Sequence, residues 1–317
     1  MISFDFSFIV VLPPIRANAR WAQNGVTVAG GHARGGANNQ LNDPWGLFVD
    51  DDQTVIVADH ANNRIIQWKV GDTSGQVIAG GNGRGNRLDQ LNSPMDVLID
   101  KETDSLIICD WGNRRVVRWS RRNGTTEGEI LVDSVTCVGL SMDNQRYLYV
   151  PDHMKHEVRR YQTGDKNGTI VAGGNGYGIG LNQLNKPSYL FVDHEQTVYV
   201  SDDGNHRVMK WNKDANEGII VAGGQGHGNA LTQLSYPNGL FVDTLGTVYV
   251  AEYGNNRVTR WPQGTTQGTV IAGGNGKGMG INQFSYPRDL AFDQHGNLYV
   301  VDLGNHRVQR FSIEIDS

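Results

Sequence analysis

The chain has 317 residues, a net charge of −5 and only two cysteines. The negative charge disfavours nucleic acid as a partner, because a phosphate backbone needs a basic surface, and two cysteines exclude a disulfide-rich scaffold. The sequence has 41 glycines and no apolar run long enough to cross a bilayer. It therefore predicts a soluble, turn-rich all-β protein with no membrane span.

Residues 1–23 are predicted to form an N-terminal extension or a weak signal-like segment. Its apolar stretch ends near Ala17-Asn18-Ala19, which resembles a signal-peptidase site, but Asp5 interrupts the stretch and no basic residue precedes it. Glycosylation sequons occur at Asn123 and Asn167, and they would be used only in a secretory compartment. An extracellular location is one interpretation, and the sequence leaves the compartment open.

Residues 24–317 repeat one unit six times. Each unit contains a short apolar run, an acid, a turn, an asparagine, a variable residue and an arginine. The arginine recurs at Arg64, Arg115, Arg207, Arg257 and Arg307, with Glu157 in the remaining slot, in steps of 51, 42, 50, 50 and 50 residues. A period of this length is typical of propellers, arrays and solenoids.

Four short β-like runs are predicted in each unit; in the fifth they cover 239–242, 247–250, 257–261 and 269–272. Residues 26–31 form an additional fourth strand before the first unit, while the last unit stops after its third strand near Ile313. Each end supplies what the other lacks. We therefore predict a closed six-bladed β-propeller, with four antiparallel strands per blade and the N-terminal strand completing the last blade.

A glycine-rich segment of constant length joins most units, with 13 residues from its second glycine to the next proline, as from Gly31 to Pro44. The segment before the third unit is eight residues shorter, and Cys137 takes the place of the proline. Cys137 and Cys109 have two interpretations, a disulfide that compensates for the short loop or two separate small buried residues. The second is the favoured one.

The phrases Asp202–Arg207 and Asp302–Arg307 resemble the NHL repeat, and the resemblance covers about residues 24–317. It implies a six-bladed β-propeller. Similar propellers act as docking platforms in tripartite-motif ubiquitin ligases, as sensor domains of bacterial kinases and as a zinc-dependent peptide-amidating lyase. Because fold alone does not choose a function, the choice depends on the variable positions.

Two variable positions per unit are expected on one face of the ring, after the proline slot and after the acid. As a binding face we predict Trp45, His60, Met95, Trp111, His153, Ser188, Asp203, Asn238, Tyr253 and Arg288, together with Val138 and Leu303. Loops that vary on a regular scaffold commonly carry binding. This mixture predicts a non-enzymatic binding or scaffold module for a protein, peptide or glycan, with no cofactor.

The alternative is a metal-dependent lyase or hydrolase with its site at the axial mouth. Zinc or calcium would be the metal, and His60 and His153 are the candidate ligands on the variable face. The repeated acids, such as Asp59 and Asp302, are instead expected to pair with the repeated arginine or with turn amides. His206 and His306 occupy a repeated position, so a structural role is expected for both.

Overall fold

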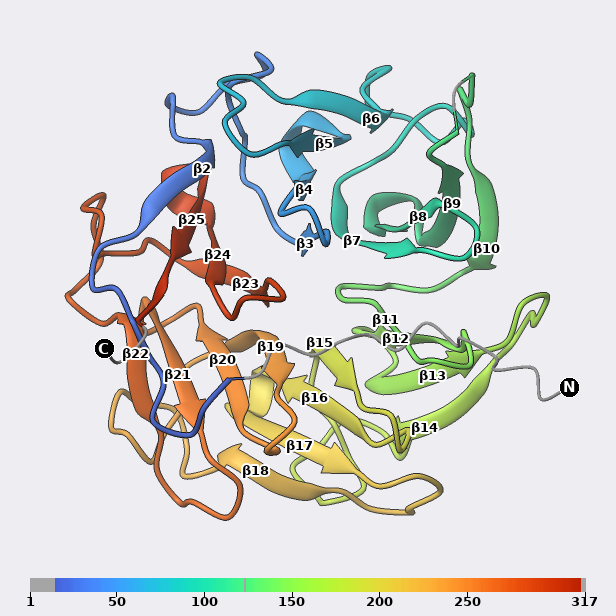
Figure 1. Cartoon of the computed structure of the whole chain (residues 1–317). Coiled ribbons are helices and arrows are strands. Elements are labelled where there is room, and N and C mark those ends of the chain that lie inside the picture. The colour runs from blue at the N-terminus through green and yellow to red at the C-terminus, as the bar shows by residue number, and fades with distance from the viewer. Residues whose placement is uncertain (1–14, 123, 315–317) are drawn as a thin grey trace, which may run out of the picture.

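Six four-stranded antiparallel sheets surround a common axis in the computed structural model, which describes residues 15–122 and 124–314 (Figure 1). The predicted closed six-bladed propeller is confirmed. In Figure 1 the first strand of each blade lies nearest the axis and the fourth lies at the circumference.

The strands follow one another from the axis outward in every blade. Blade 1 contains β3 (Leu47–Val49), β4 (Val55–Asp59), β5 (Arg64–Trp68) and β6 (Gln76–Gly80). Blade 2 contains β7 (Pro94–Asp100), β8 (Ser105–Asp110), β9 (Arg115–Ser120) and β10 (Glu129–Asp133). Blade 3 contains β11 (Ser141–Met142), β12 (Leu148–Asp152), β13 (Glu157–Tyr161) and β14 (Thr169–Gly173).

The second half of the chain repeats the arrangement. Blade 4 contains β15 (Pro187–Val192), β16 (Val198–Asp202), β17 (Arg207–Trp211) and β18 (Ile219–Gly223). Blade 5 contains β19 (Pro237–Val242), β20 (Val248–Glu252), β21 (Arg257–Trp261) and β22 (Thr269–Gly273). Blade 6 contains β23 (Pro287–Phe292), β24 (Leu298–Asp302), β25 (Arg307–Phe311) and, from the N-terminal end, β2 (Val26–Gly30).

The ring is closed by β2, which pairs antiparallel with β25 in the register Val26↔Arg310 and Gly30↔Arg307. Figure 1 shows the blue N-terminal strand beside the red C-terminal ones. Closure removes the two sheet edges that an open array would leave at its ends. After β2 in blade 6 the chain continues into blade 1, and we call this region between the two blades the seam.

A further two-stranded sheet joins β1 (Arg20–Trp21) to β26 (Ile313–Glu314). Trp21 is buried against Tyr249 and Phe292, and its Nε1 donates to the Gly296 carbonyl at 2.9 Å. Part of the segment expected as an extension therefore packs against blades 5 and 6. Residues 1–14, which hold most of the signal-like stretch, lie outside the described residues.

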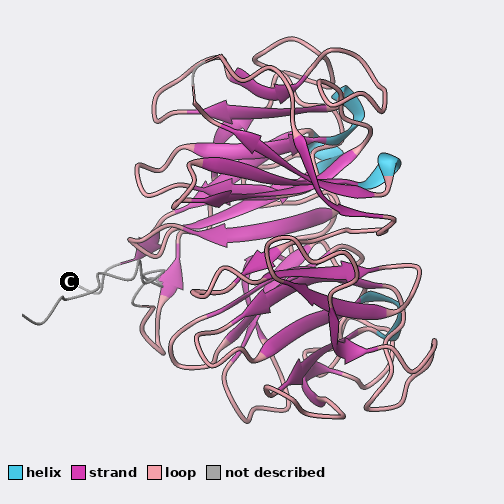
Figure 2. Ribbon diagram, turned by 90° about the vertical axis from the view of Figure 1, so that its right-hand side faces the viewer, coloured by secondary structure: helices cyan, strands magenta, loops and turns pink. Residues whose placement is uncertain are grey.

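The core lies between neighbouring blades, because the second and third strands are buried on both faces. An aromatic side chain at the end of each third strand fills this space, as expected: Trp68, Trp119, Tyr161, Trp211, Trp261 and Phe311. A short 3-10 helix joins the second and third strands in four blades: η1 (His60–Asn62), η2 (Trp111–Asn113), η3 (Asp203–Asn205) and η4 (Leu303–Asn305). Figure 2 shows these helices gathered on one face of the ring.

Candidate functional site

The repeated acid and arginine form a buried ion pair in five blades. In blade 1, Arg64 Nε donates to Asp59 Oδ2 at 2.7 Å, and Asn62 Nδ2 donates to the same oxygen at 2.8 Å. The corresponding pairs are Asp110–Arg115 (2.7 Å), Asp202–Arg207 (2.7 Å), Glu252–Arg257 (2.8 Å) and Asp302–Arg307 (2.8 Å). The predicted pairing of acid and arginine is confirmed.

The same arginines hold the glycine-rich loops. Arg64 donates from Nη1 to the Gly36 carbonyl and from Nη2 to the carbonyls of Ala37 and Gln40, at 2.9 to 3.0 Å. A guanidinium presents its donors in a fixed planar fork, so the loop must place its carbonyls at fixed points. This requirement explains the constant length of the loop.

Blade 3 lacks the arginine because it lacks the loop. The shortened segment 134–136 leaves no ring of carbonyls to bind, and Glu157 at the arginine position pairs instead with Arg159 at 2.6 Å. The acid of this blade, Asp152, lies 3.4 Å from Lys155. Two departures from the repeat, the missing arginine and the short loop, thus have one structural cause.

In five blades the variable residue before the arginine position joins neighbouring blades. His306 Nδ1 accepts the Asp43 N–H at 3.2 Å, and Asn63 Oδ1 accepts the Ser93 N–H at 2.9 Å. The same bond recurs from Lys186 to His156, from Tyr236 to His206 and from Tyr286 to Asn256. Histidine and asparagine share an acceptor at a similar reach. The structural role predicted for His206 and His306 is confirmed.

Cys109 and Cys137 form a disulfide, with the two Cα atoms 5.8 Å apart. The expectation of two separate thiols was therefore wrong. Cys109 lies in β8 of blade 2, and Cys137 enters blade 3 at the short loop, so the bond crosses the junction that has lost its loop contacts. The compensating role considered for it from the sequence is the one that the structure supports.

The predicted variable face contains a continuous stack of side chains. Arg288 lies over the Trp45 ring at 3.7 Å and over the Tyr253 ring at 4.6 Å. Trp45 stacks on His60 at 5.3 Å between ring centroids, and Tyr253 stacks on Tyr286 at 4.6 Å. The stack crosses blades 1, 5 and 6. We call Trp45, Arg288 and Tyr253 the mouth cluster.

Hydrogen bonds fix the guanidinium within this cluster. Arg288 Nη1 donates to Asn238 Oδ1 at 2.6 Å, and Asn238 Nδ2 lies 3.4 Å from Asp203 Oδ1. Arg288 Nη2 donates to no described residue, while Nε is buried and also unpaired. One arginine edge is therefore committed to the protein and another remains free for a ligand.

Burial shifts the titration of the groups around the mouth. Burial lowers the pKa of His60 to about 4, and the positive charge of Arg288 acts in the same direction. Burial raises the pKa of Asp203 to about 6, and there the charge of Arg288 acts in the opposite direction. Burial also lowers the pKa of Arg288 from its usual value. His60 is thus neutral at physiological pH, and its Nδ1 has no hydrogen-bond partner among the described residues.

The other predicted face residues differ in exposure. Met95, Val138 and Ser188 are buried, and the Ser188 hydroxyl donates to the Pro237 carbonyl at 3.3 Å. His153 Nδ1 lies 3.3 Å from the Pro187 carbonyl. Trp111 is 36% exposed and contacts no other aromatic ring among the described residues. The structure joins six of the predicted residues in one contact network: Trp45, His60, Asp203, Asn238, Tyr253 and Arg288.

The two histidines proposed as metal ligands make separate contacts in different blades. His60 stacks on Trp45 in blade 1, whereas His153 faces the Pro187 carbonyl from blade 3. Within residues 15–122 and 124–314, no group of three or more His, Cys, Asp or Glu side chains is arranged to hold a metal ion. The same part of the chain has no helix long and apolar enough to cross a membrane.

Two buried carboxylates on the first strands of blades 2 and 6, Asp96 and Asp289, were not predicted from the sequence. Asp96 Oδ2 accepts the Leu140 N–H from blade 3 at 2.7 Å, and Asp289 Oδ2 accepts the Leu47 N–H from blade 1 at 2.9 Å. Burial raises the pKa of both carboxyl groups, and the charge of Asp289 raises the pKa of Asp96 further. The Tyr189 hydroxyl reaches the Met95 carbonyl, 3.5 Å away in blade 2.

A sequence signal for these carboxylates existed in the residue that follows the first variable position. That residue is glycine in blades 1, 3 and 5 and larger in the others, in the order Gly46, Asp96, Gly139, Tyr189, Gly239 and Asp289. A Cβ on Gly239 would lie 2.4 Å from Asp289 Oδ1, and one on Gly46 would lie 2.4 Å from Asp96 Oδ1. The glycines therefore make room for the carboxylates of the next blade.

Comparison with known proteins identifies the repeat and the fold. The NHL repeat model matches residues 41–68, 234–261 and 284–311, which belong to blades 1, 5 and 6. A search among curated proteins found no match.

Two similar solved structures come from Bacteroides thetaiotaomicron. One is a structural genomics protein of unknown function, with a TM-score of 0.73 and 18% identity over 93% of this chain and 77% of the other. The second is an auxiliary nutrient binding protein, with a TM-score of 0.70 and 16% identity over 94% of this chain and 77% of the other. A virginiamycin B lyase from Staphylococcus aureus is also similar, with a TM-score of 0.57 and 11% identity over 88% of this chain and 98% of the other. At these identities the likeness concerns the fold alone. The chain thus contains NHL repeats, and the matched repeats lie within a closed ring of six blades.

Proposed function

We propose that the protein is a binding module that docks a protein or peptide partner on the mouth face, with the mouth cluster as the centre of contact. The observation that carries this proposal is the free Nη2 of Arg288, held between the rings of Trp45 and Tyr253. Tryptophan, tyrosine and arginine are the residues enriched at the energetic centres of protein interfaces. Here three of them are already ordered without a partner.

Pre-organisation favours this reading of the cluster. A free arginine side chain loses rotamer entropy when it binds, at a cost of about 0.5–1.5 kcal/mol for each immobilised long side chain. Arg288 is already fixed by two rings and by Asn238 at 2.6 Å, so that cost is largely met on folding. A partner carboxylate could then form charge-assisted hydrogen bonds with the free edge of the guanidinium.

A glycan is less well matched to the same cluster. Sugars bind by laying their apolar face on an aromatic ring, but Trp45 already stacks on His60 and Tyr253 already stacks on Tyr286. The rings of the mouth cluster are thus engaged within the protein. The remaining groups are polar edges, which suit the backbone and acidic side chains of a polypeptide.

The test is a selection of displayed random peptides on the purified protein, followed by affinity measurement with Trp45→Ala, Tyr253→Ala and Arg288→Met variants. Peptides that dock on the mouth should lose about 2 kcal/mol, or roughly 30-fold in Kd, with each variant. Tyr177→Ala is the matched control, because Tyr177 is 65% exposed on a glycine-rich loop away from the cluster. Selected peptides that bind every variant equally would refute the proposal. Glycan-array ligands that depend on Trp45, in the absence of peptide ligands, would replace it with a carbohydrate-binding function.

We further propose that the protein works in an oxidising compartment. The Cys109–Cys137 bond supports this, because such bonds persist mainly in secreted and periplasmic proteins. The sequon at Asn167 lies in an exposed turn, while the one at Asn123 falls outside the described residues. Mass spectrometry of the natively expressed protein after thiol labelling would contradict the proposal if both cysteines were labelled without reduction.

A further inference from the structure

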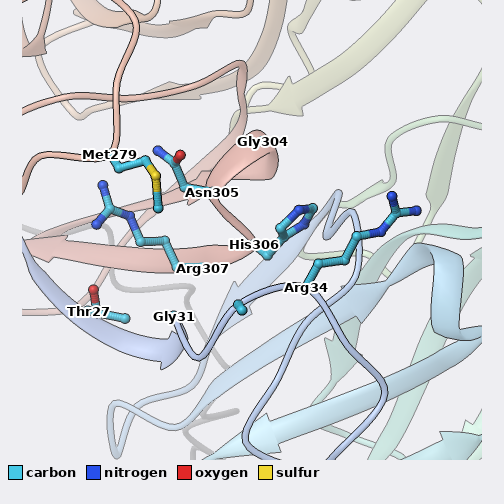
Figure 3. Close-up of a pocket in the computed structure, with 9 residues that line it drawn as sticks. Thr27, Gly31, Arg34, Met279, Gly304, Asn305, His306 and Arg307 are labelled. Carbon is cyan, nitrogen blue, oxygen red and sulfur yellow. The ribbon is translucent and has the colours of Figure 1, made fainter.

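The seam has a surface hollow of about 260 Å³ that is separate from the mouth cluster. It is lined by β2, by the glycine-rich loops on either side of it and by the turn that enters β25. Its side chains are Thr27, Arg34, Met279, Asn305, His306 and Arg307. Figure 3 shows Met279, Asn305 and Arg307 grouped above Thr27, with His306 between this group and Arg34.

The lining has a one-sided charge. It includes two arginines and a histidine but no aspartate or glutamate. The acids that pair with these arginines, Asp302 and Asp43, are not among the lining residues. The side chains that a ligand meets are therefore cationic or neutral hydrogen-bond donors, with Asp302 paired to Arg307 and Asp43 beside both Arg34 and His306.

Arg307 differs from the other four repeated arginines in one hydrogen bond. In those four, Nη1 donates to a loop carbonyl: Gly36, Asn86, Ile179 and Asn229 in chain order. Arg307 keeps Nε on Asp302 and Nη2 on the carbonyls of Gly280 and Gln283, but its Nη1 has no acceptor among the described residues. The residue is 8% exposed, and Nη1 is not among its fully buried atoms, so an unpaired cationic donor is accessible at the hollow.

Two neutral donors accompany it. The Thr27 hydroxyl has no partner within the part of the chain that the structure describes. His306 Nδ1 accepts the Asp43 N–H at 3.2 Å, so in the neutral ring the proton resides on Nε2, which can donate. A cationic N–H, a hydroxyl and an imidazole N–H are the donors that an oxyanion requires.

We propose that the seam hollow is a binding site for a small-molecule oxyanion, a carboxylate or a phosphate, recognised by Arg307, Thr27 and His306. The hollow is slightly smaller than the roughly 300–1,000 Å³ typical of drug-sized ligand sites, so the ligand is a small metabolite. Because β2 and β25 both border the hollow, a bound oxyanion also links the two strands that close the ring. This site is independent of the docking function proposed for the mouth.

The test uses isothermal titration calorimetry with citrate and, separately, with inorganic phosphate, at constant ionic strength. Met279→Glu places a carboxylate at the rim without touching the ion pair of Arg307. Ile179→Glu is the matched control, because Ile179 holds the same position in the loop of blade 4 and is 79% exposed, against 78% for Met279. Like charges placed side by side cost enough to weaken binding by about tenfold or more.

The expected result is saturable 1:1 binding of citrate or phosphate that Met279→Glu weakens at least about tenfold and Ile179→Glu leaves unchanged. The probe that binds identifies the oxyanion class. Absence of saturable binding by both probes overturns the proposal. Equal weakening by the two variants also overturns it, because the effect would then come from general surface charge. Circular dichroism melting of both variants checks that each is folded.

Discussion

Replacement of Arg207 by methionine tests whether the repeated arginines hold the glycine-rich loops. Arg207 bonds Asp202 at 2.7 Å and donates to the carbonyls of Ile179, Gly180 and Gln183. Methionine keeps much of the side-chain volume but leaves Asp202, which is fully buried, without its cation. Removing one partner of a buried ion pair costs about 3–5 kcal/mol.

This free energy converts into a modest change in melting temperature. The entropy of unfolding is about 2.1 cal/mol/K per residue, or roughly 0.7 kcal/mol/K for a chain of this length. A loss of about 4 kcal/mol therefore lowers Tm by about 6 °C. Arg118→Met is the matched control, because Arg118 also lies on a third strand but pairs with Glu129 at the surface, where such pairs contribute about 1 kcal/mol or less.

The assay combines thermal unfolding, followed by circular dichroism, with hydrogen exchange of the loop. Gly178 and Gln183 donate their amides to Leu184 and Gly180 within the loop, and their exchange should accelerate in Arg207→Met while the strand amides stay protected. Equal changes in Tm for the two variants would refute the reasoning. So would unchanged exchange of the loop amides, because the arginine would then not be what orders the loop.

Three further changes address the junctions between blades. Replacing Cys109 and Cys137 by serine should lower the free energy of unfolding by about 3 kcal/mol, as expected for the loss of a disulfide that closes a loop of this size. If the bond is responsible, the variant and the reduced parent protein should have the same denaturation midpoint. Asp289→Asn should reduce the pH dependence of the free energy of unfolding. Burial raises the pKa of Asp289 from 3.8 to about 7. The protonated carboxyl group therefore contributes its full stabilisation below pH 3.8, and this stabilisation is lost as the pH rises through 7. Urea titrations at pH 4 and pH 7 should show the parent losing more stability than the variant over this interval, and the opposite order would contradict the sign. Gly239→Ala forces a Cβ to within 2.4 Å of Asp289 and should cost about 1–3 kcal/mol, whereas Gly36→Ala, which meets only ordinary contacts, should leave Tm nearly unchanged.

The fold could be predicted from the sequence because the same structural unit occurs six times along the chain. A single acid-to-arginine phrase has many structural explanations, but six in register, with complementary chain ends, require a closed ring. The pairing of Asp302 with Arg307 followed for the same reason, since a contact inside one unit repeats whenever the unit repeats. What the unit binds to in its own loop, such as the carbonyl of Gly280, could not be read from residue types because every residue has a carbonyl.

Contacts between units were harder to predict. The Cys109–Cys137 bond depends on how closely two blades approach where the loop is short, and spacing along the chain carries no information about that distance. The mouth cluster was predicted as a face but not as a stack, because the position of Arg288 between Trp45 and Tyr253 depends on rotamers in three different blades. The buried carboxylates Asp96 and Asp289 were missed because an aspartate stands at this position in only two units, so the pattern is not a repeat.

The alternation of glycine with larger residues from one first strand to the next has a consequence for how this ring can be altered. Gly46, Gly139 and Gly239 each yield space to the following blade, so blades 1 and 2, 3 and 4, and 5 and 6 form three steric pairs. The packing pattern therefore repeats every two blades, and the ring contains three such pairs. Excising or duplicating one blade would set two bulky residues, or two glycines, side by side around the axis. Excising or duplicating a steric pair would preserve the alternation, so the pair, and not the blade, is the modular element for engineering this protein.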